Sequence, residues 1–407
     1  MKTYLKIAWR NLWRNKRRTI LTILSVFFAV FLALLMRSMQ LGSYDMMVES
    51  AVKTSTGYIQ VHEKGYWDDK SINNTMETSP ELENRIDQTR HITQTVPRLE
   101  SFALASSGEQ TKGIAVFGTN FQKEAADSGL DKKVIRGSYL ETNQDGVLVA
   151  EDLAAYLKLD VGDSVVLLSQ GYHGITAAGE YEIAGILQFT TPAMNSSLIY
   201  MGLPAAQYFY GAPNRLTSIS IMLDDQDNMQ KVTGSLNKID PENLEVMTWN
   251  EMLTEIVQQI QSDNIGGKFM LGILYLVVGF GIFGTIMMMT VERKKEFGIM
   301  VAVGMRRVKL SVIIFFETII IGVLGIILGI TGSLPVIFYL HHNPVQLTGE
   351  AAEAMKEFNV EPILPFLIDS GYFINQAIVV LALTLIAVVY PLALIKRFRV
   401  ISALRSK

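Results

Sequence analysis

The side chains that could do chemistry in this chain are few and scattered. Its 407 residues contain no cysteine, which excludes thiol nucleophiles, disulfides, cysteine-bound zinc and iron–sulfur clusters. The five histidines are His62, His91, His173, His341 and His342. Only the last two are neighbours, and adjacent histidines rarely bind one metal without carboxylates at helical spacing. The sequence also lacks the G-x-S-x-G, H-E-x-x-H and G-x-x-x-x-G-K-[ST] motifs. We therefore predict neither a metal site nor catalytic residues.

Two glycine patterns and one acid lie inside long apolar segments. Gly279-Phe-Gly-Ile-Phe-Gly284 matches G-x-G-x-x-G, but no strand precedes it. We interpret it, like Gly325-x-x-x-Gly329, as helix packing through small residues. Glu317 is a functional candidate because acids are costly inside a membrane. It lies about two turns from the basic end of its segment, so we favour capping, snorkelling or pairing with Lys or Arg over a proton relay.

The stretch VERKKEFGIMVAVGMRR, residues 291–307, places apolar residues between two basic clusters and between two long apolar segments. An apolar patch that neither a membrane nor a core requires usually marks a docking site. The alternative is a helix lying flat on the bilayer, with Lys and Arg on the headgroups. The pattern alone does not separate these two interpretations.

The docking segment and Glu317 lie among segments that indicate a membrane protein. Hydrophobic residues make up 49% of the chain and charged residues 18%, and the net charge of −3 argues against a nucleic-acid partner. A bilayer core about 30 Å thick needs about 20 apolar residues as a helix. The predicted transmembrane helices are 19–44, 267–291, 310–340 and 371–395. The first is too long for a cleaved signal peptide and lacks a clear cleavage site.

Lys and Arg gather on one side of these spans, in residues 1–18, 292–309 and 396–407. The positive-inside rule places these three segments and both termini in the cytoplasm. Residues 45–266 and the loop 341–370 then lie outside.

Residues 45–266, the segment between the first two predicted spans, combine strand and helix patterns. Alternating stretches such as SISIML indicate strands, GVLVAEDLAAYLKLDVGDSVVLL indicates strand, helix, turn and strand, and 241–270 indicates a helix that continues into the second span. Residues 188–197 are uncharged and predict an outward loop. The expected fold is an α-helical membrane protein with four transmembrane helices and a large mixed α/β extracytoplasmic domain inserted between helices 1 and 2.

The stretch VERKKEFGIMVAVGMRRVKL resembles the coupling-helix signature of the MacB/FtsX/LolC-type ABC permeases, the type VII ABC transporters. Arg293, Glu296, Gly298, Ala302 and Gly304 fill the pattern Arg-x-x-Glu-φ-Gly-x-φ-x-Ala-φ-Gly, where φ is apolar. AWRNLWRNKRRTILTIL resembles the amphipathic elbow of that family, and FFETIIIGVLGIILG resembles its third span, including the acid. YPLALIKRFRVISALR resembles the closing motif, with Arg-Val in place of the usual apolar-Pro.

The resemblance implies that this segment, the coupling helix 292–309, docks on an ATPase. The docking residues would be Arg293, Glu296, Phe297, Gly298, Ile299, Ala302, Val303, Gly304 and Met305. It further implies two ATPase subunits that hold ATP and Mg, and a second permease, identical or paralogous. This chain would bind no cofactor, catalyse no reaction and transmit the ATP-driven motion mechanically.

One face of the first span could meet a lipid-like cargo. Phe28, Leu32, Leu35, Met36 and Met39 follow helical spacing, and Met and Phe adapt to varied acyl chains. Ordinary contact with lipid or a helix is the alternative.

GYIQVHEKGY and the size of the excursion resemble the LolC/LolE branch, whereas a MacB chain carries its ATPase before the elbow. The resemblance thus implies release of lipid-anchored lipoproteins to a periplasmic carrier. The alternatives are MacB-like efflux with a periplasmic adaptor, an FtsX-like regulator of a periplasmic hydrolase, and a sensor.

Overall fold

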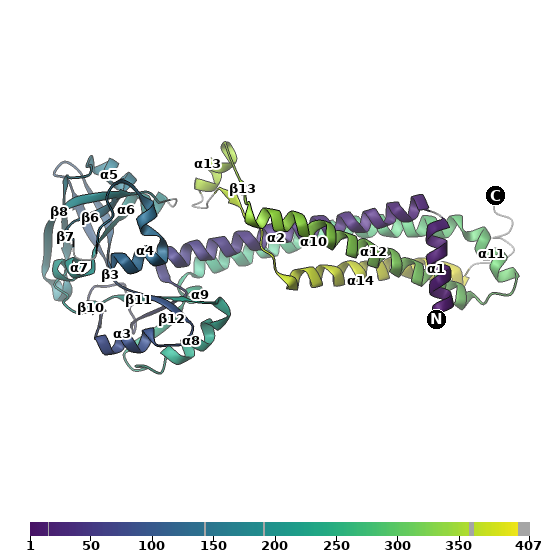
Figure 1. The fold of residues 1–407 in the computed structure, drawn as a ribbon, viewed down its shortest axis with the longest axis horizontal. Coiled ribbons are helices and arrows are strands. Elements are labelled where there is room, and N and C mark those ends of the chain that lie inside the picture. The colour runs from purple at the N-terminus through teal and green to yellow at the C-terminus, as the bar shows by residue number, and fades with distance from the viewer. Residues whose placement is uncertain (15, 142–143, 190–191, 358–361, 398–407) are drawn as a thin grey trace. The chain divides into compact units, whose positions relative to one another are not determined.

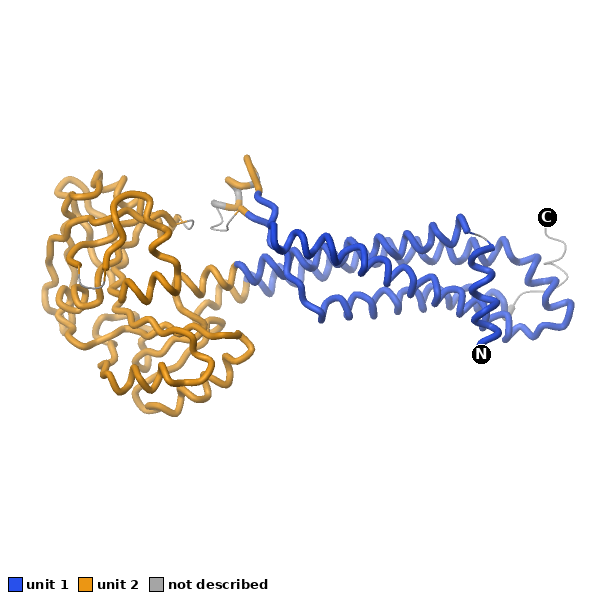
Figure 2. The backbone as a smooth tube through the Cα atoms, in the orientation of Figure 1, with its two compact units in different colours: residues 1–46, 259–346, 363–407 blue, residues 47–258, 347–362 orange. Residues whose placement is uncertain are grey.

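The computed structural model describes residues 1–14, 16–141, 144–189, 192–357 and 362–397, which form two compact units (Figures 1 and 2). The helical unit holds residues 1–46, 259–346 and 363–407, and the α/β unit holds 47–258 and 347–362. The insertion of the α/β unit between the first two long helices confirms the predicted fold class.

The helical unit is built from long apolar helices and two shorter ones, α1 and α11. They are α1 (Lys2–Arg14), α2 (Lys16–Ala51), α10 (Thr254–Glu292), α11 (Lys294–Ala302), α12 (Arg307–His342) and α14 (Ser370–Arg397). In the described part of the chain, four of them, α2, α10, α12 and α14, are long and apolar enough to cross a membrane. Each predicted span lies within one of these four helices, which extend beyond the predicted bounds because their polar end turns remain helical.

Small residues set the closest helix contacts. A Cβ added to Gly325 or Gly329 of α12 would lie 2.5 or 2.6 Å from the Cβ of Val26 or Val30 on α2. These two glycines therefore pack a helix, as predicted. Gly281 and Gly284 on α10 differ, because an added Cβ would meet nothing within 4 Å. The predicted packing role of 279–284 is thus not realised at these two positions within this chain.

The short helix α1 is amphipathic, and its two faces meet different surroundings. Ala8 and Leu12 are buried against the other helices of the unit, whereas Trp9 and Trp13 are 45% and 44% exposed. Large amphipathic aromatic side chains of this kind favour the interface between membrane and water. This burial fixes α1 beside α12.

The α/β unit contains one mixed sheet of ten strands. In chain order they are β1 (Ile59–Glu63), β3 (Ile92–Ser106), β4 (Thr111–Thr119), β5 (Val134–Gly137), β6 (Val147–Ala150), β7 (Ser164–Gln170), β8 (Thr176–Leu187), β9 (Leu198–Gly202), β11 (Ser218–Leu223) and β12 (Leu244–Thr248). The strand order is β12-β1-β11-β3-β4-β9-β6-β8-β5, and β7 pairs with β3 and β8. The pairs β4–β9 and β6–β8 are parallel, and the remaining pairs are antiparallel.

The long strand β3 joins two hydrophobic cores of this sheet. Its first half pairs with β11, beside a core that includes Ile59, Ile86 and Val232, and its second half pairs with β4 and β7, beside a core that includes Leu99, Leu148 and Tyr200. Arg98 lies where β3 changes its pairing partner, opposite both Ser218 of β11 and Thr119 of β4. The strand thus runs past both cores of the sheet.

Two local predictions were wrong. Residues 244–248 form β12 rather than helix, because this stretch pairs with β1 along its whole length. The helix then restarts as α9 (Trp249–Met252), breaks at Leu253 and continues as α10. Within 188–197, residues 190–191 lie outside the described residues, and residues 192–197 form α6 (Pro192–Ser197) rather than a loop. The Asn195 side chain of this helix is buried and accepts a hydrogen bond from the Phe189 amide at 3.0 Å.

The remaining segments are short. The predicted loop 341–370 contains the two-stranded pairing of β13 (Val345–Gln346) with β14 (Ile363–Leu364), and also α13 (Glu350–Glu357). The predicted tail 396–407 begins within α14, and its residues 398–407 lie outside the described residues.

Candidate functional site

The predicted docking segment forms a short helix in a sharp turn between two long ones. Helix α10 ends at Glu292, α11 begins at Lys294, and α12 begins at Arg307. Gly304 closes α11 with a φ of 103°, a backbone region that residues with a side chain rarely adopt. This glycine is therefore needed for the chain to turn back into α12.

One face of α11 is anchored in the helical unit. The Phe297 side chain is 3% exposed and packs in a cluster with Leu310, Ile314, Val388 and Ile395. Gly298 beside it is also buried. Burial of a Phe side chain contributes on the order of 2 kcal/mol. Phe297 and Gly298 were predicted to dock on a partner, but in this structure they are covered by the chain itself.

A buried ion pair fixes the start of α11. Arg293 is 6% exposed, and its Nη1 donates to Oε2 of Glu317 at 2.6 Å. The other carboxylate oxygen of Glu317 accepts from Asn11 Nδ2 at 2.7 Å. Glu317 is thus paired with a basic residue, as the sequence favoured. The contribution of Asn11 was not predicted, because a single amide on α1 carries no sequence signal that links it to α12.

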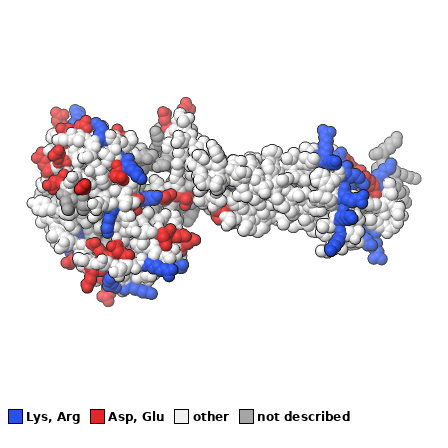
Figure 3. Space-filling view, in the orientation of Figure 1, with Lys and Arg blue, Asp and Glu red and all other residues white. Residues whose placement is uncertain are grey.

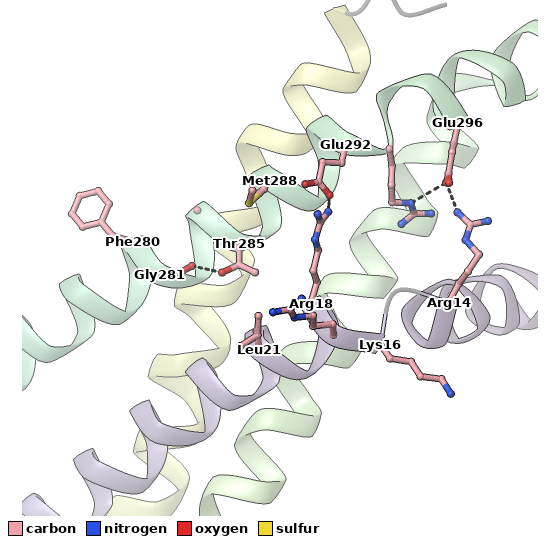
Figure 4. Close-up of a pocket in the computed structure, with 13 residues that line it drawn as sticks. Arg14, Lys16, Arg18, Leu21, Phe280, Gly281, Thr285, Met288, Glu292 and Glu296 are labelled. Atoms are coloured by element: carbon pink, nitrogen blue, oxygen red, sulfur yellow. Dashed lines mark hydrogen bonds and ion pairs between the residues drawn. The ribbon is translucent and has the colours of Figure 1, made fainter. Parts of the chain in front are cut away.

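Three further ion pairs lie around this buried pair and extend to the surface (Figure 4). Glu296 pairs with Arg14, and its Oε2 also lies 3.3 Å from Nε of Arg293. Glu292, at the end of α10, pairs with Arg18 at the start of α2. We call these residues, with Glu317 and Asn11, the coupling cluster. Its residues come from α1, α2, α10, α11 and α12, with Arg293 between α10 and α11.

The opposite face of α11 is open. Ile299 is 50% exposed and Val303 is 85% exposed, and Ala302 and Gly304 are exposed beside them. Met305 is half-buried against the cluster that holds Phe297. The predicted set therefore divides by structure: Ile299, Ala302, Val303 and Gly304 are accessible, and Arg293, Phe297 and Gly298 hold the helix in place.

Charge is concentrated around this site. Lys and Arg gather at the end of the helical unit that carries α1 and α11, while the visible middle of the unit shows almost no charge (Figure 3). The groove beside the cluster is lined by residues of α2 and α10. A partner with acidic residues around an apolar pocket would complement this end.

The predicted cargo-facing residues of the first span differ in exposure. Phe28 and Leu32 are 54% and 49% exposed. Leu35 and Met39 pack against the core of the helical unit, and Met36 is half-buried. Only Phe28 and Leu32 are fully available to lipid or to another molecule.

A second charged cluster lies inside the α/β unit. Arg98 is fully buried, and its Nε and Nη2 donate to the two carboxylate oxygens of Glu124 on α4 (Phe121–Ser128), at 3.1 and 2.7 Å. Its Nη1 donates to the Ser55 carbonyl in the helical turn 52–56 that follows α2. Arg98 therefore ties that turn to the sheet.

Two more acids surround this single guanidinium. Glu100 Oε1 lies 3.8 Å from Arg98 Nη1 and has no hydrogen bond, and Asp127 Oδ2 is also buried without one. Burial raises the pKa of Glu100 to about 7 and that of Asp127 to about 6, and the positive charge of Arg98 only partly offsets this. Both acids thus hold their protons more tightly than in water.

No group of three or more metal-ligating side chains occurs among the described residues. Nδ1 of His341 lies 2.6 Å from the Phe366 carbonyl, and Nδ1 of His342 lies 3.0 Å from the Phe338 carbonyl, so the pair belongs to local structure.

Comparison with known families identifies the class. Residues 19–239 match the MacB-like periplasmic core domain and residues 268–400 match the FtsX-like permease C-terminal domain. Since the first match alone covers more than half of the chain, the protein belongs to the MacB/FtsX-type family of ABC transporter permeases. It is accordingly a multi-pass membrane protein with an extracytoplasmic domain, a non-catalytic permease whose class works with an ATPase.

Several characterised and uncharacterised relatives are similar at low identity. The chain is 24% identical to the lipoprotein-releasing system transmembrane protein LolE of Haemophilus influenzae, covering 61% of each chain. It is 22% identical to the macrolide export ATP-binding/permease protein MacB of Wolinella succinogenes, over 82% of this chain and 52% of that protein. It is 25% identical to the uncharacterized ABC transporter permease protein Rv0987 of Mycobacterium tuberculosis, over 58% of this chain and 27% of that protein.

A crystal structure of the periplasmic region of MacB from Actinobacillus actinomycetemcomitans aligns with 51% of this chain and 94% of its own, with a TM-score of 0.37 and 15% identity. Among the relatives LolE, MacB and Rv0987, the matched part of this chain spans between about a quarter and three fifths of the relative's own length.

Proposed function

We propose that this chain receives the motion of a separate ATPase at α11 and transmits it through α2 and α10 to the α/β domain. The observation that carries the proposal is the division of α11 into an anchored face and an open face. Phe297 and Arg293 fix the helix to the unit, and Ile299 and Val303 are left for a partner. A force on the open face is then passed directly to the coupling cluster.

Energy for this motion would come from ATP and Mg bound by two ATPase subunits. ATP shifts the conformation of the permease only if the ATPase binds α11 differently in its open and closed states. A second permease, identical or paralogous, would complete the complex. In this orientation α11 and both termini lie in the cytoplasm, in agreement with the basic end of the helical unit.

The cargo we propose is lipoprotein, extracted from the outer leaflet of the inner membrane and passed to a periplasmic carrier. The similarity to LolE supports this, because it covers an equal share, 61%, of both chains. MacB-like efflux with a periplasmic adaptor is the second candidate, favoured by relatives that match 82% of this chain.

Affinity purification tests the docking surface. We expect Ile299→Asp with Val303→Asp to abolish recovery of the ATPase while the permease still folds, because both side chains are exposed. Tyr208→Asp, at a residue 87% exposed in the α/β unit, is the matched control and should retain the ATPase. Phe297→Glu is unsuitable, since it would place a charge in a packed cluster. Full recovery of ATPase with the double variant would reject α11 as the docking site.

Depletion of the chain in cells separates the two cargoes. If lipoprotein is the cargo, lipoproteins destined for the outer membrane accumulate in the inner membrane on depletion. If efflux is the function, lipoprotein sorting is unchanged and sensitivity to exported compounds rises.

A further inference from the structure

A groove of about 1090 Å³ opens on the helical unit between the start of α2 and the last turns of α10 (Figure 4). Its floor is apolar and open. Leu21 is 55% exposed, Phe280 is 67% exposed and Met288 is 60% exposed, and all three line it. Its mouth is basic, because Lys16, Arg17 and Arg18 line the same groove.

Glycines make the floor hollow. Gly281 and Gly284 line the groove, and a Cβ at either position would meet nothing within 4 Å. From Phe280 to Glu292, α10 rises about 18 Å at about 1.5 Å per residue. This length is close to half of a hydrocarbon core about 30 Å thick. The groove therefore follows the depth of one leaflet.

The basic mouth holds two cations beyond those that the coupling cluster uses. Arg14 pairs with Glu296 and Arg18 pairs with Glu292. Lys16 and Arg17 are exposed, and neither makes an ion pair with any residue that the structure describes. Two such cations above an apolar floor complement a molecule with a negative headgroup and an acyl chain. A free phosphate would leave the floor uncovered, and a zwitterionic lipid would leave positive charge uncompensated.

We propose that this groove binds one anionic phospholipid of the leaflet at the basic end of the helical unit. Its phosphate lies at Lys16 and Arg17, and an acyl chain lies along Gly281 and Gly284. Since Glu292, Arg293 and Glu296 line the same groove, the bound lipid lies beside the coupling cluster. This inference needs only that the helices span a membrane, and it does not depend on the proposed cargo or on ATPase docking.

Native mass spectrometry of the delipidated full chain in detergent tests the headgroup. We expect dioleoylphosphatidylglycerol to remain bound at concentrations where dioleoylphosphatidylcholine does not. Replacing both Lys16→Gln and Arg17→Gln should weaken binding of the anionic lipid roughly 30-fold, from the attraction of two basic residues. Lys295→Gln with Lys309→Gln, two exposed cations outside the groove, is the matched control and should change binding little.

A second variant tests the floor. Gly284→Leu fills the groove without a clash and improves helix propensity, so the chain should fold while losing the lipid. Gly272→Leu, on the same helix and equally open, is the control and should retain it. Helical circular dichroism and thermal unfolding check that both variants are folded.

Three results would overturn the proposal. Equal retention of the two lipids would show that the headgroup is not recognised. Unchanged binding with Lys16→Gln plus Arg17→Gln would show that these cations do not hold it. If Gly284→Leu instead converts a dimer into monomers and leaves lipid binding unchanged, the groove is covered by a second copy of the chain.

Discussion

Both units of this protein contain a charged cluster built around a buried arginine. The ion pair of one cluster is fully buried, whereas the ion pairs of the other extend to the protein surface. Arg98 in the α/β unit and its partner Glu124 are both 0% exposed. Arg293 in the helical unit pairs with the buried Glu317 and also with Glu296, whose side chain is 46% exposed. The first cluster is closed within the domain, and the second continues to the surface through Arg14.

This difference indicates different roles. A closed pair can be broken only by leaving a charge buried and unpaired, so it fixes one arrangement of the strands and the turn 52–56. A pair at the surface contributes little to stability, because water or another charge replaces the partner at low cost. We therefore expect the outer pairs of the coupling cluster to exchange partners readily and the Arg98 cluster to keep one fixed arrangement.

The largest effect should follow from opening the closed cluster. We expect Glu124→Ala to destabilise the α/β unit by about 3–5 kcal/mol, because the buried Arg98 charge then loses the two carboxylate oxygens that accept its hydrogen bonds. Thermal unfolding of the full chain in nanodiscs measures this. Glu109→Ala removes an acid whose side chain is 80% exposed and should leave the melting temperature nearly unchanged. Equal melting temperatures for the two variants would contradict a rigid role for Arg98.

The inner pair of the coupling cluster should matter less for stability. We expect Glu317→Ala to cost about 2–3 kcal/mol, because Arg293 keeps Glu296 as a partner. Glu317→Gln keeps one acceptor oxygen, which can serve either Asn11 or Arg293, and should recover part of this loss. Chemical unfolding curves of the two variants provide the comparison. A loss with Glu317→Ala as large as that with Glu124→Ala would remove the distinction between the clusters.

Glu100 should make the α/β unit pH-dependent. Its pKa is about 7 in the folded chain and near 4.5 when unfolded, so the folded state binds more protons between these values. The contribution of Glu100 to stability is therefore greatest below about pH 4.5 and falls as pH rises to about 7, by on the order of 3 kcal/mol. We expect Glu100→Gln to flatten the melting temperature between pH 5 and pH 7.5 and to raise it at pH 7.5.

Asp127 should add a smaller dependence of the same sign, since its pKa is raised to about 6. We therefore expect Asp127→Asn to change the pH dependence of the melting temperature less than Glu100→Gln does, and only at lower pH. A pH profile that stays unchanged in both variants would show that neither acid retains its proton in the folded state.

The smallest effect on stability should come from the outer pair. Arg14→Gln removes an exposed partner of Glu296, so we expect a cost below about 1 kcal/mol. Under the proposed function, however, this variant should alter ATP turnover of the purified complex, because Glu296 is then held by Arg293 alone. Lys6→Gln on the same helix is the control. Normal turnover in Arg14→Gln would place the outer pair outside the transmission path.

The sequence predicted the fold class because each span is longer and more apolar than a globular helix needs, and because strand alternation is local. It failed at 244–248, where pairing with β1 overrides a helical pattern. The sequence also could not separate the anchoring residues of the docking segment from its accessible residues. Phe297 and Val303 are both apolar residues of one short helix, and only packing against Leu310 and Val388 makes one of them structural.

What the sequence determined by itself is therefore what depends on neighbours in the chain: the number of spans and the α/β character of residues 45–266. The tertiary structure alone decided the contacts between distant segments. Asn11 meets Glu317, Arg98 reaches Ser55 and Glu124, and α2 meets α10 along a basic groove. Such contacts depend on which helix faces and strand registers meet, and a single side chain carries no local pattern that records its distant partner.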